Sequence, residues 1–310
     1  MDYRILGKTG LTVSQLSLGG AAFGQQYGPI SLQDAQETVH AALDAGINFI
    51  DTSAYYGLGR SEEILGEIFA QGLRDRFILC TKAGRLDRDR FDFSPAGMRA
   101  CFEGSLQRLR TDHVEILLAH DIEFADDYER VFDETAAVLH DLKREGKCRF
   151  IGMSGYPLGL LRQAIEHCHL DVVISYCHFN LQNDRLLTEL LPVAESHGVG
   201  VLNASPLAMG LLTPQGPPPW HPASETIKQL CKAAADYCHS LGQNIATLGM
   251  QFCYAEPRIP STITGTAKRT ELETNLEALK SPPDSTLLVA VQQILAPIHN
   301  QTWPSGRYRE

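Results

Sequence analysis

Residues 31–51 read SLQDAQETVHAALDAGINFID, and this stretch contains the unit from which most of the chain is built. Ser31 is a typical N-cap residue, and apolar residues recur after it at helical spacing until Gly46, so the pattern predicts a helix over residues 31–45. Residues 48–51 follow as a short apolar run that is typical of a buried strand. The number of times this order of helix and strand recurs decides the fold class.

Eight such strands are predicted, and helices separate them. The strands span residues 16–18, 48–51, 77–81, 116–119, 150–153, 172–176, 199–203 and 261–264. The helices span residues 31–45, 61–69, 94–109, 128–145, 158–167, 185–197, 224–241, 270–279 and 284–294. This alternation implies parallel strands joined by right-handed crossovers. A doubly wound open sheet would alternate in the same way, but the count of eight favours a (β/α)8 TIM barrel, with residues 1–310 as one domain.

Two segments extend this plan. Residues 3–13, YRILGKTGLTV, predict a small N-terminal β-hairpin that turns at residues 8–10 and covers the floor of the barrel. Residues 206–223 are rich in Pro and Gly and form a long loop after the seventh strand. That loop lies on the side where barrels carry their active sites.

The composition limits the partners that we expect. The chain of 310 residues is 44% hydrophobic and 21% charged, which is ordinary for a globular protein, and its formal net charge is −10. Nucleic-acid binders and binders of anionic membranes are usually basic, so we expect neither partner. No apolar stretch suits a secretion signal or a membrane span, and no two of the 8 cysteines have metal-binding spacing. We therefore expect a cytoplasmic protein without a metal, either a monomer or a small homo-oligomer.

Several short motifs do not indicate a binding site. GKT at residues 7–9 lacks the upstream glycine of a phosphate loop, since Asp2 stands there, and no G-x-G-x-x-G follows any strand. His167, Cys168 and His169 are adjacent and polar, and a solvated helix end is favoured over a metal site.

Ionisable residues mark the ends of three consecutive predicted strands. Asp51 ends the second strand, Lys82 follows the third and His120 follows the fourth. Tyr56 lies in the loop after the second strand. Each residue alone has an ordinary interpretation as a turn cap, a solvated lysine, a core histidine or a packing tyrosine. Because the carboxyl ends of parallel barrel strands meet on one rim, the four together indicate an active site.

These four side chains can share one proton-transfer chemistry. A buried Lys82 needs a partner, and Asp51 is suited to that role. The ammonium beside Tyr56 is expected to lower the phenol pKa from about 10, which makes Tyr56 usable as an acid or a base. His120 would bind and orient the reacting oxygen. Such a site suits the interconversion of an alcohol and a carbonyl, with a cofactor that carries the hydride.

The four residues resemble the catalytic tetrad of the aldo-keto reductases. The matching motifs are DTSAYYG at 51–57, TKAGR at 81–85 and LLAHD at 117–121. The resemblance continues through RILGKTGLTVSQLSLGG, GYPLGLLRQAI and SPLAMGLLT. It implies that Tyr56 transfers the proton and that His120 positions the substrate oxygen. It also implies that Lys82 and Asp51 tune Tyr56.

Further stretches resemble one branch of that family, the L-galactose dehydrogenases. They read ILLAHDIEF, VVISYCHFNL, NASPLAMGLLTPQGPPPWHPAS and TWPSG. The resemblance implies oxidation of the anomeric carbon C1 of a sugar to a galactonolactone with NAD, in ascorbate biosynthesis or sugar catabolism. A dehydrogenase for another aldose (L-fucose, D-arabinose), a pyridoxal dehydrogenase and an NADPH-dependent aldehyde reductase are alternatives. A non-catalytic, nicotinamide-sensing subunit like the potassium-channel β-subunits belongs to a different class.

The resemblance also implies where the cofactor binds, with the pyrophosphate along residues 205–211 and the adenosine near residues 265–275. The expected cofactor-binding residues are Gly20, Ser154, Tyr176, Ser205, Leu207, Gly210, Leu211, Gly265, Thr266, Glu271 and Asn275. Glu271 stands where NADP-preferring relatives often carry Arg, and a carboxylate would repel a 2′-phosphate, which favours NAD over NADP. Lys268 and Arg269 could still serve a phosphate, and Glu271 could be a solvated residue of a helix first turn.

The sugar is expected to contact Tyr56, His120, Asp121, His178, Trp220 and Trp303. Aromatic faces suit the apolar faces of a sugar, although both Trp residues could instead hold loops in place. The chain also departs from the family pattern. Gly155, Tyr176 and Ala204 stand where many relatives carry Asn, Gln and an aromatic residue, so the nicotinamide must be held partly in another way.

Overall fold

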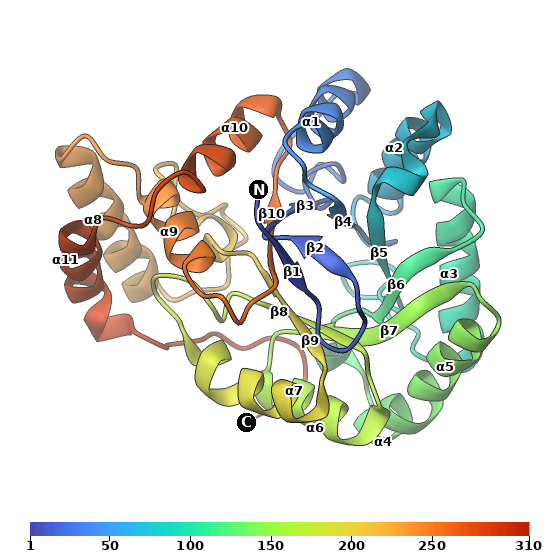
Figure 1. The fold of residues 1–310 in the computed structure, drawn as a ribbon. Helices are drawn as coiled ribbons and strands as arrows, with labels where there is room; N and C mark the ends of the chain where they lie inside the picture. Colours follow the sequence, from blue (N-terminus) through green and yellow to red (C-terminus); the bar gives the residue numbers. More distant parts are fainter. Residues whose placement is uncertain (310) are drawn as a thin grey trace.

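The computed structural model describes residues 1–309 as a barrel of eight parallel strands ringed by helices (Figure 1). The barrel strands are β3 (Leu16–Gly19), β4 (Phe49–Asp51), β5 (Ile78–Ala83), β6 (Val114–Ala119), β7 (Cys148–Gly155), β8 (Val172–Tyr176), β9 (Gly200–Ala204) and β10 (Ser261–Gly265). They close in the order β10-β3-β4-β5-β6-β7-β8-β9. Each of the eight predicted strands overlaps one of them, so the predicted (β/α)8 barrel is confirmed.

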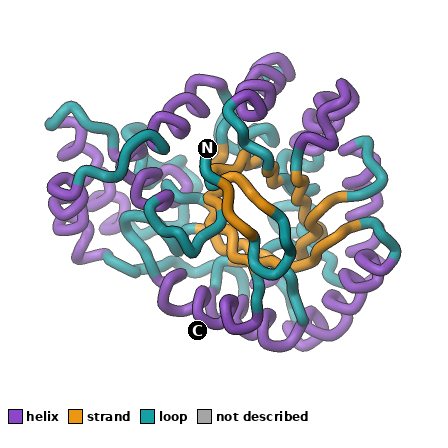
Figure 2. Tube along the Cα trace, in the orientation of Figure 1, coloured by secondary structure: helices purple, strands orange, loops and turns teal. Residues whose placement is uncertain are grey.

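The helices enclose the strands on the outside, as Figure 2 shows. They are α1 (Leu32–Asp44), α2 (Arg60–Ile68), α3 (Pro95–Leu109), α4 (Tyr128–Arg130), α5 (Ala136–Arg144), α6 (Leu158–Cys168), α7 (Leu191–His197), α8 (Glu225–Ser240), α9 (Ile245–Tyr254), α10 (Arg269–Ala278) and α11 (Ser285–Leu295). Ser31 caps α1 as predicted, because its side chain accepts a hydrogen bond from the Asp34 N–H.

Helix α9 was not among the predicted helices. It reads IATLGMQFCY, with buried apolar residues on most of its surface and Gly249 near its middle, so it shows no clear polar face. It connects β9 to β10 and occupies the place of the seventh barrel helix. Helix α8, which was predicted there, instead lies outside the ring beside α11 (Figure 1). Its apolar side, with Ile227 and Cys231, packs against Leu287 and Val291 of α11.

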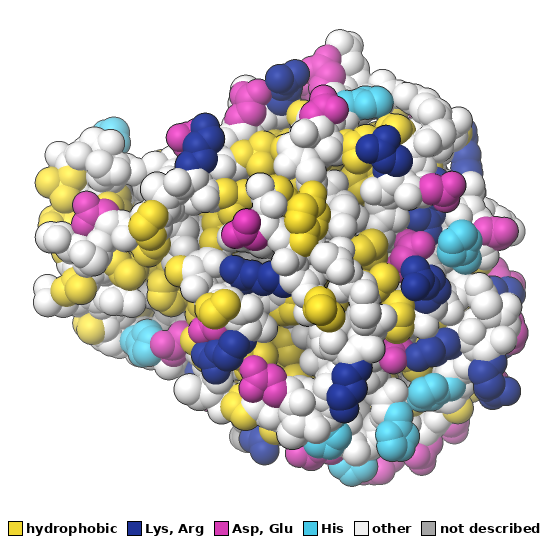
Figure 3. All heavy atoms as spheres, in the orientation of Figure 1, with side chains coloured by type: hydrophobic (Ala, Val, Ile, Leu, Met, Phe, Trp, Pro, Cys, Tyr) yellow, Lys and Arg dark blue, Asp and Glu magenta, His cyan; other side chains and the backbone are white. Residues whose placement is uncertain are grey.

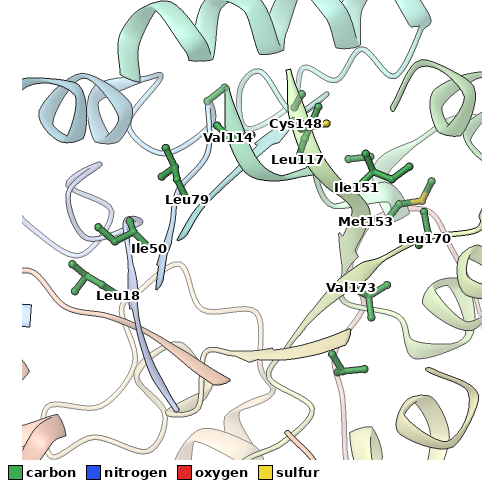
Figure 4. Close-up of a cluster of buried hydrophobic side chains, with 14 of the residues drawn as sticks. Leu18, Ile50, Leu79, Val114, Leu117, Cys148, Ile151, Met153, Leu170 and Val173 are labelled. Carbon is green, nitrogen blue, oxygen red and sulfur yellow. The ribbon is translucent and has the colours of Figure 1, made fainter. Parts of the chain in front are cut away.

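Alternate residues of each strand face two different cores. One set packs against the helices, and Figure 4 shows part of it: Leu18, Ile50, Leu79, Val114, Leu117, Cys148, Ile151, Met153, Leu170 and Val173. The other set fills the barrel interior and includes Phe49, Cys80, Ile116 and Leu118. This alternation follows from the pleat of a strand, which sends successive side chains to opposite faces.

The N-terminal hairpin closes one end of the barrel. Strands β1 (Tyr3–Ile5) and β2 (Thr12–Ser14) pair antiparallel, and the residues around their turn, such as Leu6 and Leu11, join the interior cluster. The Lys8 N–H donates to the Gly198 carbonyl at 2.9 Å, just before β9 begins. This face carries acidic and basic side chains intermixed (Figure 3). The carboxyl ends of the strands open on the opposite rim.

The eight cysteines are all free and buried. Within residues 1–309, no group of three or more His, Cys, Asp or Glu side chains is placed to hold a metal ion. Across the same residues, every helix is too short or too polar to cross a bilayer.

Candidate active site

The barrel brings the four candidate catalytic residues together on its open rim. Asp51 is the last residue of β4, Lys82 lies near the end of β5, and His120 directly follows β6. Tyr56 lies in the turn that leads from β4 to α2. Strands β4, β5 and β6 are neighbours in the barrel, and Lys82 pairs in register with Leu118 of β6. The strand ends therefore place the four side chains side by side, as the sequence predicted.

Lys82 is the centre of this group. Its ammonium donates to Asp51 Oδ2 at 2.6 Å and to the Thr52 carbonyl at 2.9 Å. It also donates to the Tyr56 hydroxyl oxygen at 3.0 Å. An ammonium has three protons, so these bonds use all of them. Because the lysine donates to the phenol oxygen, the Tyr56 proton remains available for a reaction.

The structure corrects the expected protonation of Tyr56. Burial raises the pKa of Tyr56 to about 12, because the phenolate would lose its hydration, and Lys82 only partly offsets this rise. The expectation that the ammonium lowers this pKa below its ordinary value is therefore wrong. Burial alone would lower the pKa of Lys82, but Asp51, Tyr56 and Cys80 together outweigh it and keep the pKa of Lys82 high. At neutral pH the site holds a phenol beside an ammonium.

His120 is neutral and oriented by Ser53. Burial lowers the pKa of His120 to about 3, and the nearby carboxylate of Asp121 offsets this only in part. The His120 Nδ1 lies 2.7 Å from the Ser53 hydroxyl, whose oxygen accepts from the Tyr55 N–H at 3.0 Å. The Ser53 proton is thus free to bond to Nδ1, which favours the tautomer with a proton on Nε2. The Nε2–H group can then donate to the oxygen of a substrate.

The expected cofactor residues line the same rim. Gly20 follows β3, Ser154 belongs to β7, Tyr176 ends β8, Ser205 follows β9 and Gly265 ends β10. The Gly20 N–H donates to the Asp51 carbonyl at 2.7 Å, so this glycine lies directly beside the candidate catalytic group. A Cβ atom on Gly20 would lie 2.7 Å from the Ser61 hydroxyl, so the close approach needs glycine. The structure therefore places these residues at the carboxyl ends of the barrel strands, on the same rim as the candidate catalytic group.

The loop after β9 has a backbone suited to an anion. Ser205, Ala208 and Met209 have left-handed backbone, with φ of 55°, 48° and 52°. Such residues turn neighbouring N–H groups to one side, where they can bind a phosphate. The N–H groups of Ala208, Gly210 and Leu211 are used in turns within the loop. The pyrophosphate site that the resemblance implies along this loop stays a prediction.

Two residues expected to lie near the adenosine, Asn275 and Glu271, make different contacts. Asn275 is buried and donates to the Thr266 hydroxyl at 3.3 Å, so these two residues are held together. Glu271 instead caps α10, and its Oε2 accepts from the N–H groups of Ala267 at 2.7 Å and Lys268 at 3.3 Å. Glu271 therefore lies in the first turn of α10, as in the alternative interpretation from the sequence, and its carboxylate caps that helix.

The expected sugar-binding residues divide into two groups. Asp121 lies at the centre, with Oδ2 3.6 Å from His120 Nε2. His178, Trp303 and Trp220 instead belong to an aromatic chain at the side of the rim. His178 contacts the Tyr156 ring at 4.5 Å between ring centres, and Trp303 stacks on Tyr156 at 5.3 Å. Trp220 is 46% exposed, and the centre of its ring lies 6.1 Å from the centre of the Tyr27 ring.

Two polar residues near the site were not predicted. Arg85 forms a buried ion pair with Asp121. Glu123 is fully buried, and its Oε1 accepts from the hydroxyls of Tyr176 and Ser305, each at 3.0 Å. Both residues lie in stretches that resembled the family, TKAGR and ILLAHDIEF, and that position was the only signal for them.

Comparisons with known proteins agree with this geometry. Residues 15–295 match the model of the aldo/keto reductase family. The chain is 43% identical over 315 residues to L-galactose dehydrogenase of Arabidopsis thaliana, covering 99% of this chain and 98% of that protein. It is 33% identical over 324 residues to D-arabinose 1-dehydrogenase of Saccharomyces cerevisiae, covering 95% and 94%. The holo form of an aldo-keto reductase from Bacillus halodurans has the same fold, with a TM-score of 0.80 at 23% identity over 99% of this chain and 100% of that one. The chain therefore belongs to the aldo/keto reductase family of NAD(P)-dependent oxidoreductases.

Proposed function

We propose that this chain is an aldose 1-dehydrogenase that oxidises C1 of L-galactose to a galactonolactone with NAD. The observation that carries the proposal is the partly buried Tyr56 hydroxyl, 3.0 Å from the Lys82 ammonium on the rim of the barrel. This arrangement suits the transfer of a proton to or from an oxygen on a carbon that exchanges hydride. The full-length similarity to an L-galactose dehydrogenase supports the choice of sugar.

Each catalytic role follows from a contact already described. Tyr56, as the phenolate stabilised by Lys82, takes the proton of the C1 hydroxyl. His120 donates its Nε2–H to the same oxygen and holds it in position. Asp51 keeps Lys82 charged and fixed by their bond at 2.6 Å. A bound nicotinamide ring would supply the acceptor for the hydride that leaves C1.

We assign the cofactor to the rim at the ends of β3 and of β7 to β10. The residues proposed to hold it are Gly20, Ser154, Tyr176, Ser205, Leu207, Gly210, Leu211, Gly265, Thr266, Glu271 and Asn275. The preference for NAD depends on the carboxylate of Glu271, which adds negative charge where an extra 2′-phosphate would lie. The sugar would lie against Asp121, with the aromatic chain of His178, Trp303 and Trp220 at the side.

D-Arabinose is a second candidate substrate, because the chain is also similar over nearly its full length to a D-arabinose 1-dehydrogenase. In the pyranose form, D-arabinose has the ring hydroxyls of L-galactose without the C6 group. A site that recognises those hydroxyls would therefore accept both sugars to some degree.

Steady-state rates on a panel of aldoses test the proposal. The panel contains L-galactose, L-fucose and D-arabinose, each with NAD and with NADP. We expect the highest kcat/KM for L-galactose with NAD, above the rate of simple aldehyde reduction near neutral pH. Faster reduction of simple aldehydes with NADPH would replace the proposal with an aldehyde reductase. Cofactor binding without turnover of any substrate would favour a nicotinamide sensor.

A further inference from the structure

A second buried ion pair lies next to the proposed catalytic group. Arg85 follows β5 by two residues and Asp121 follows β6 by two residues, so the pair joins neighbouring strand ends. Arg85 Nη1 donates to Asp121 Oδ2, and the two side chains are 14% and 8% exposed. Burying an ion pair costs free energy that the attraction between the charges often fails to offset. Stability alone is therefore a weak reason for a pair of charges at this position.

Aromatic rings hold Arg85 in place. Its guanidinium lies 3.8 Å from the ring centre of Tyr55, with Phe124 at 5.1 Å and Phe91 at 5.5 Å. Phe91 and Phe124 stack on each other at 4.7 Å. Contacts of this kind fix the plane of a guanidinium group. The Arg85 Nε atom is buried without a hydrogen-bond partner in the described residues, so the pair leaves some of its bonding capacity unused.

Asp121 has a strained backbone that directs it toward the site. Its φ is 53°, in the left-handed region, which costs a non-glycine residue roughly 1 kcal/mol. The Asp121 N–H bonds to the Ser154 hydroxyl at 3.2 Å, which holds this conformation. As a result Asp121 Oδ2 lies 3.6 Å from His120 Nε2. Strain of this kind is typical of functional sites.

We propose that the Arg85–Asp121 pair recognises the hydroxyl on the carbon next to the reacting carbon, and so selects neutral, polyhydroxylated substrates. The identification of that substrate as an aldose rests on the proposed function. His120 contacts the reacting oxygen, and Asp121 offers the next polar atoms beyond it. A hydroxyl can donate to the carboxylate and accept from the guanidinium at the same time, through charge-assisted hydrogen bonds.

The charges of the site support a neutral substrate. Lys82 is balanced by Asp51, Arg85 is balanced by Asp121, and His120 is neutral. Burial alone would raise the pKa of Asp121, but the neighbouring His120, Arg85 and Lys82 lower this pKa overall, which favours the ionised carboxylate. A substrate with its own carboxylate would bring an unbalanced charge close to Asp121. Such an ion would lose its hydration without a free cation to replace it.

The test compares two small aldehydes that differ at the carbon next to the carbonyl. Glyceraldehyde carries a hydroxyl there and 3-hydroxypropanal does not, while both carry one on the next carbon. The quantity measured is the ratio of their kcat/KM values for reduction with NADH or NADPH. A site built to bind a hydroxyl rejects an analogue that lacks it, because its buried polar groups are left unpaired. We expect the unmodified enzyme to prefer glyceraldehyde by roughly a hundredfold.

Two variants remove the recognition in different ways. Asp121→Asn removes the charged acceptor, and Arg85→Lys keeps a positive charge but loses the planar fork. We expect each to lower the glyceraldehyde-to-3-hydroxypropanal ratio of kcat/KM by about tenfold or more, because glyceraldehyde loses more than 3-hydroxypropanal. Arg85→Lys leaves no unpaired buried carboxylate, so it provides a folded variant even if Asp121→Asn is unstable.

Glu115→Gln is the matched control. Glu115 lies at the opposite end of β6 and forms an ion pair with Arg74 at 2.9 Å. The side chains of Glu115 and Arg74 are 12% and 13% exposed. Breaking this pair should lower the melting temperature without changing the ratio. A merely structural role for Arg85 and Asp121 would give the same result in their variants.

The outcomes separate this inference from the proposed function. A ratio near one in the unmodified enzyme, or an unchanged ratio in both variants, would overturn the inference, even if aldoses are oxidised. A second outcome is that no aldose is oxidised, but the preference for glyceraldehyde is present and falls in the variants. This outcome would support the inferred role of the Arg85–Asp121 pair. In that case the proposed aldose dehydrogenase is wrong.

Discussion

Tyr56 lies where burial and a neighbouring cation act on its pKa in opposite directions. Burial is the larger effect and raises the pKa to about 12, while Lys82 opposes it. The resting phenol is therefore suited to give a proton to a carbonyl oxygen. In the oxidative direction, the reactive phenolate is a small fraction that increases with pH. The direction of the reaction thus decides how the enzyme responds to pH.

We expect kcat/KM for sugar oxidation to rise with pH. Because the phenol pKa lies near 12, each unit of pH below it should increase the phenolate share, and the rate, about tenfold. A pH–rate profile from about pH 6 to pH 10 measures this slope. A plateau that begins below pH 8 would mean that the phenol pKa in the working site is far lower than burial implies.

The roles of single residues could be inferred from the sequence only in part. The Tyr56 group could be predicted because the carboxyl ends of parallel strands meet on one rim. Arg85 could not, since an arginine two residues beyond a strand is usually solvated. The rings that surround it come from three separate segments, at Tyr55, Phe91 and Phe124, which only the fold brings together.

The elements around the rim are tied together by the buried carboxyl of Glu123. It lies in the loop after β6, and it bonds Tyr176 at the end of β8 and Ser305 in the C-terminal tail. Its backbone carbonyl also accepts from the Arg307 N–H at 2.7 Å. Glu123 therefore links two strand ends to the tail that carries Trp303.

Glu123 should make the stability depend on pH. Burial, with a contribution from the charge of Asp121, raises the pKa of Glu123 from 4.5 to about 8. Between these values the folded chain holds a proton that the unfolded chain has released, so the free energy of unfolding falls as pH rises. Each pKa unit corresponds to about 1.4 kcal/mol, so the loss should reach several kcal/mol.

Denaturant unfolding at several pH values checks this expectation, with Glu123→Gln as the comparison. The Gln variant cannot ionise and should lack the decrease between about pH 5 and pH 8. His120 acts in the opposite direction, because its folded pKa of about 3 lies below its ordinary value of 6.5 and favours folding as pH rises. Both the unmodified protein and Glu123→Gln contain His120, so comparing them removes its effect. Equal slopes of the free energy of unfolding against pH in the two proteins would refute the role of Glu123.

The helices show why element prediction was incomplete. Helix α1 has a capping serine, one apolar side and a following glycine, and was predicted nearly to the residue. Helix α9 lacks a polar side because it lies between the barrel and other elements, so the pattern that reveals a surface helix is absent. The sequence therefore indicated the order of the strands more completely than the helices that connect them.

The whole molecule separates a stabilising end from a reactive end. The hairpin closes the floor, and the strand ends with ionisable groups lie on the opposite rim. Barrel folds commonly divide stability and catalysis in this way. Substitutions in the floor should then change stability and leave the site chemistry intact.

Gly7 and Gly10 of the hairpin test this division. Both have positive φ, 52° and 71°, but a Cβ on Gly7 would lie 2.4 Å from the Gly200 nitrogen, whereas Gly10 has no other atom within 4 Å. Gly10→Ala should lose roughly 1 kcal/mol from backbone strain alone. Gly7→Ala should lower the free energy of unfolding by roughly 1–3 kcal/mol more than Gly10→Ala does, because its new Cβ atom also clashes with the backbone. Thermal unfolding measures both, and equal losses, or a changed kcat/KM, would contradict the separation.

The central claim is that the Tyr56 hydroxyl transfers the proton. Its most direct test is the kcat of Tyr56→Phe together with the cofactor Kd, measured by quenching of Trp fluorescence. Tyr254→Phe serves as the control, because the Tyr254 hydroxyl is buried in α9 without a hydrogen-bond partner in the described residues. We predict that Tyr56→Phe lowers kcat by roughly a thousandfold while the cofactor Kd stays nearly unchanged. Turnover close to that of the unmodified enzyme would contradict the assignment.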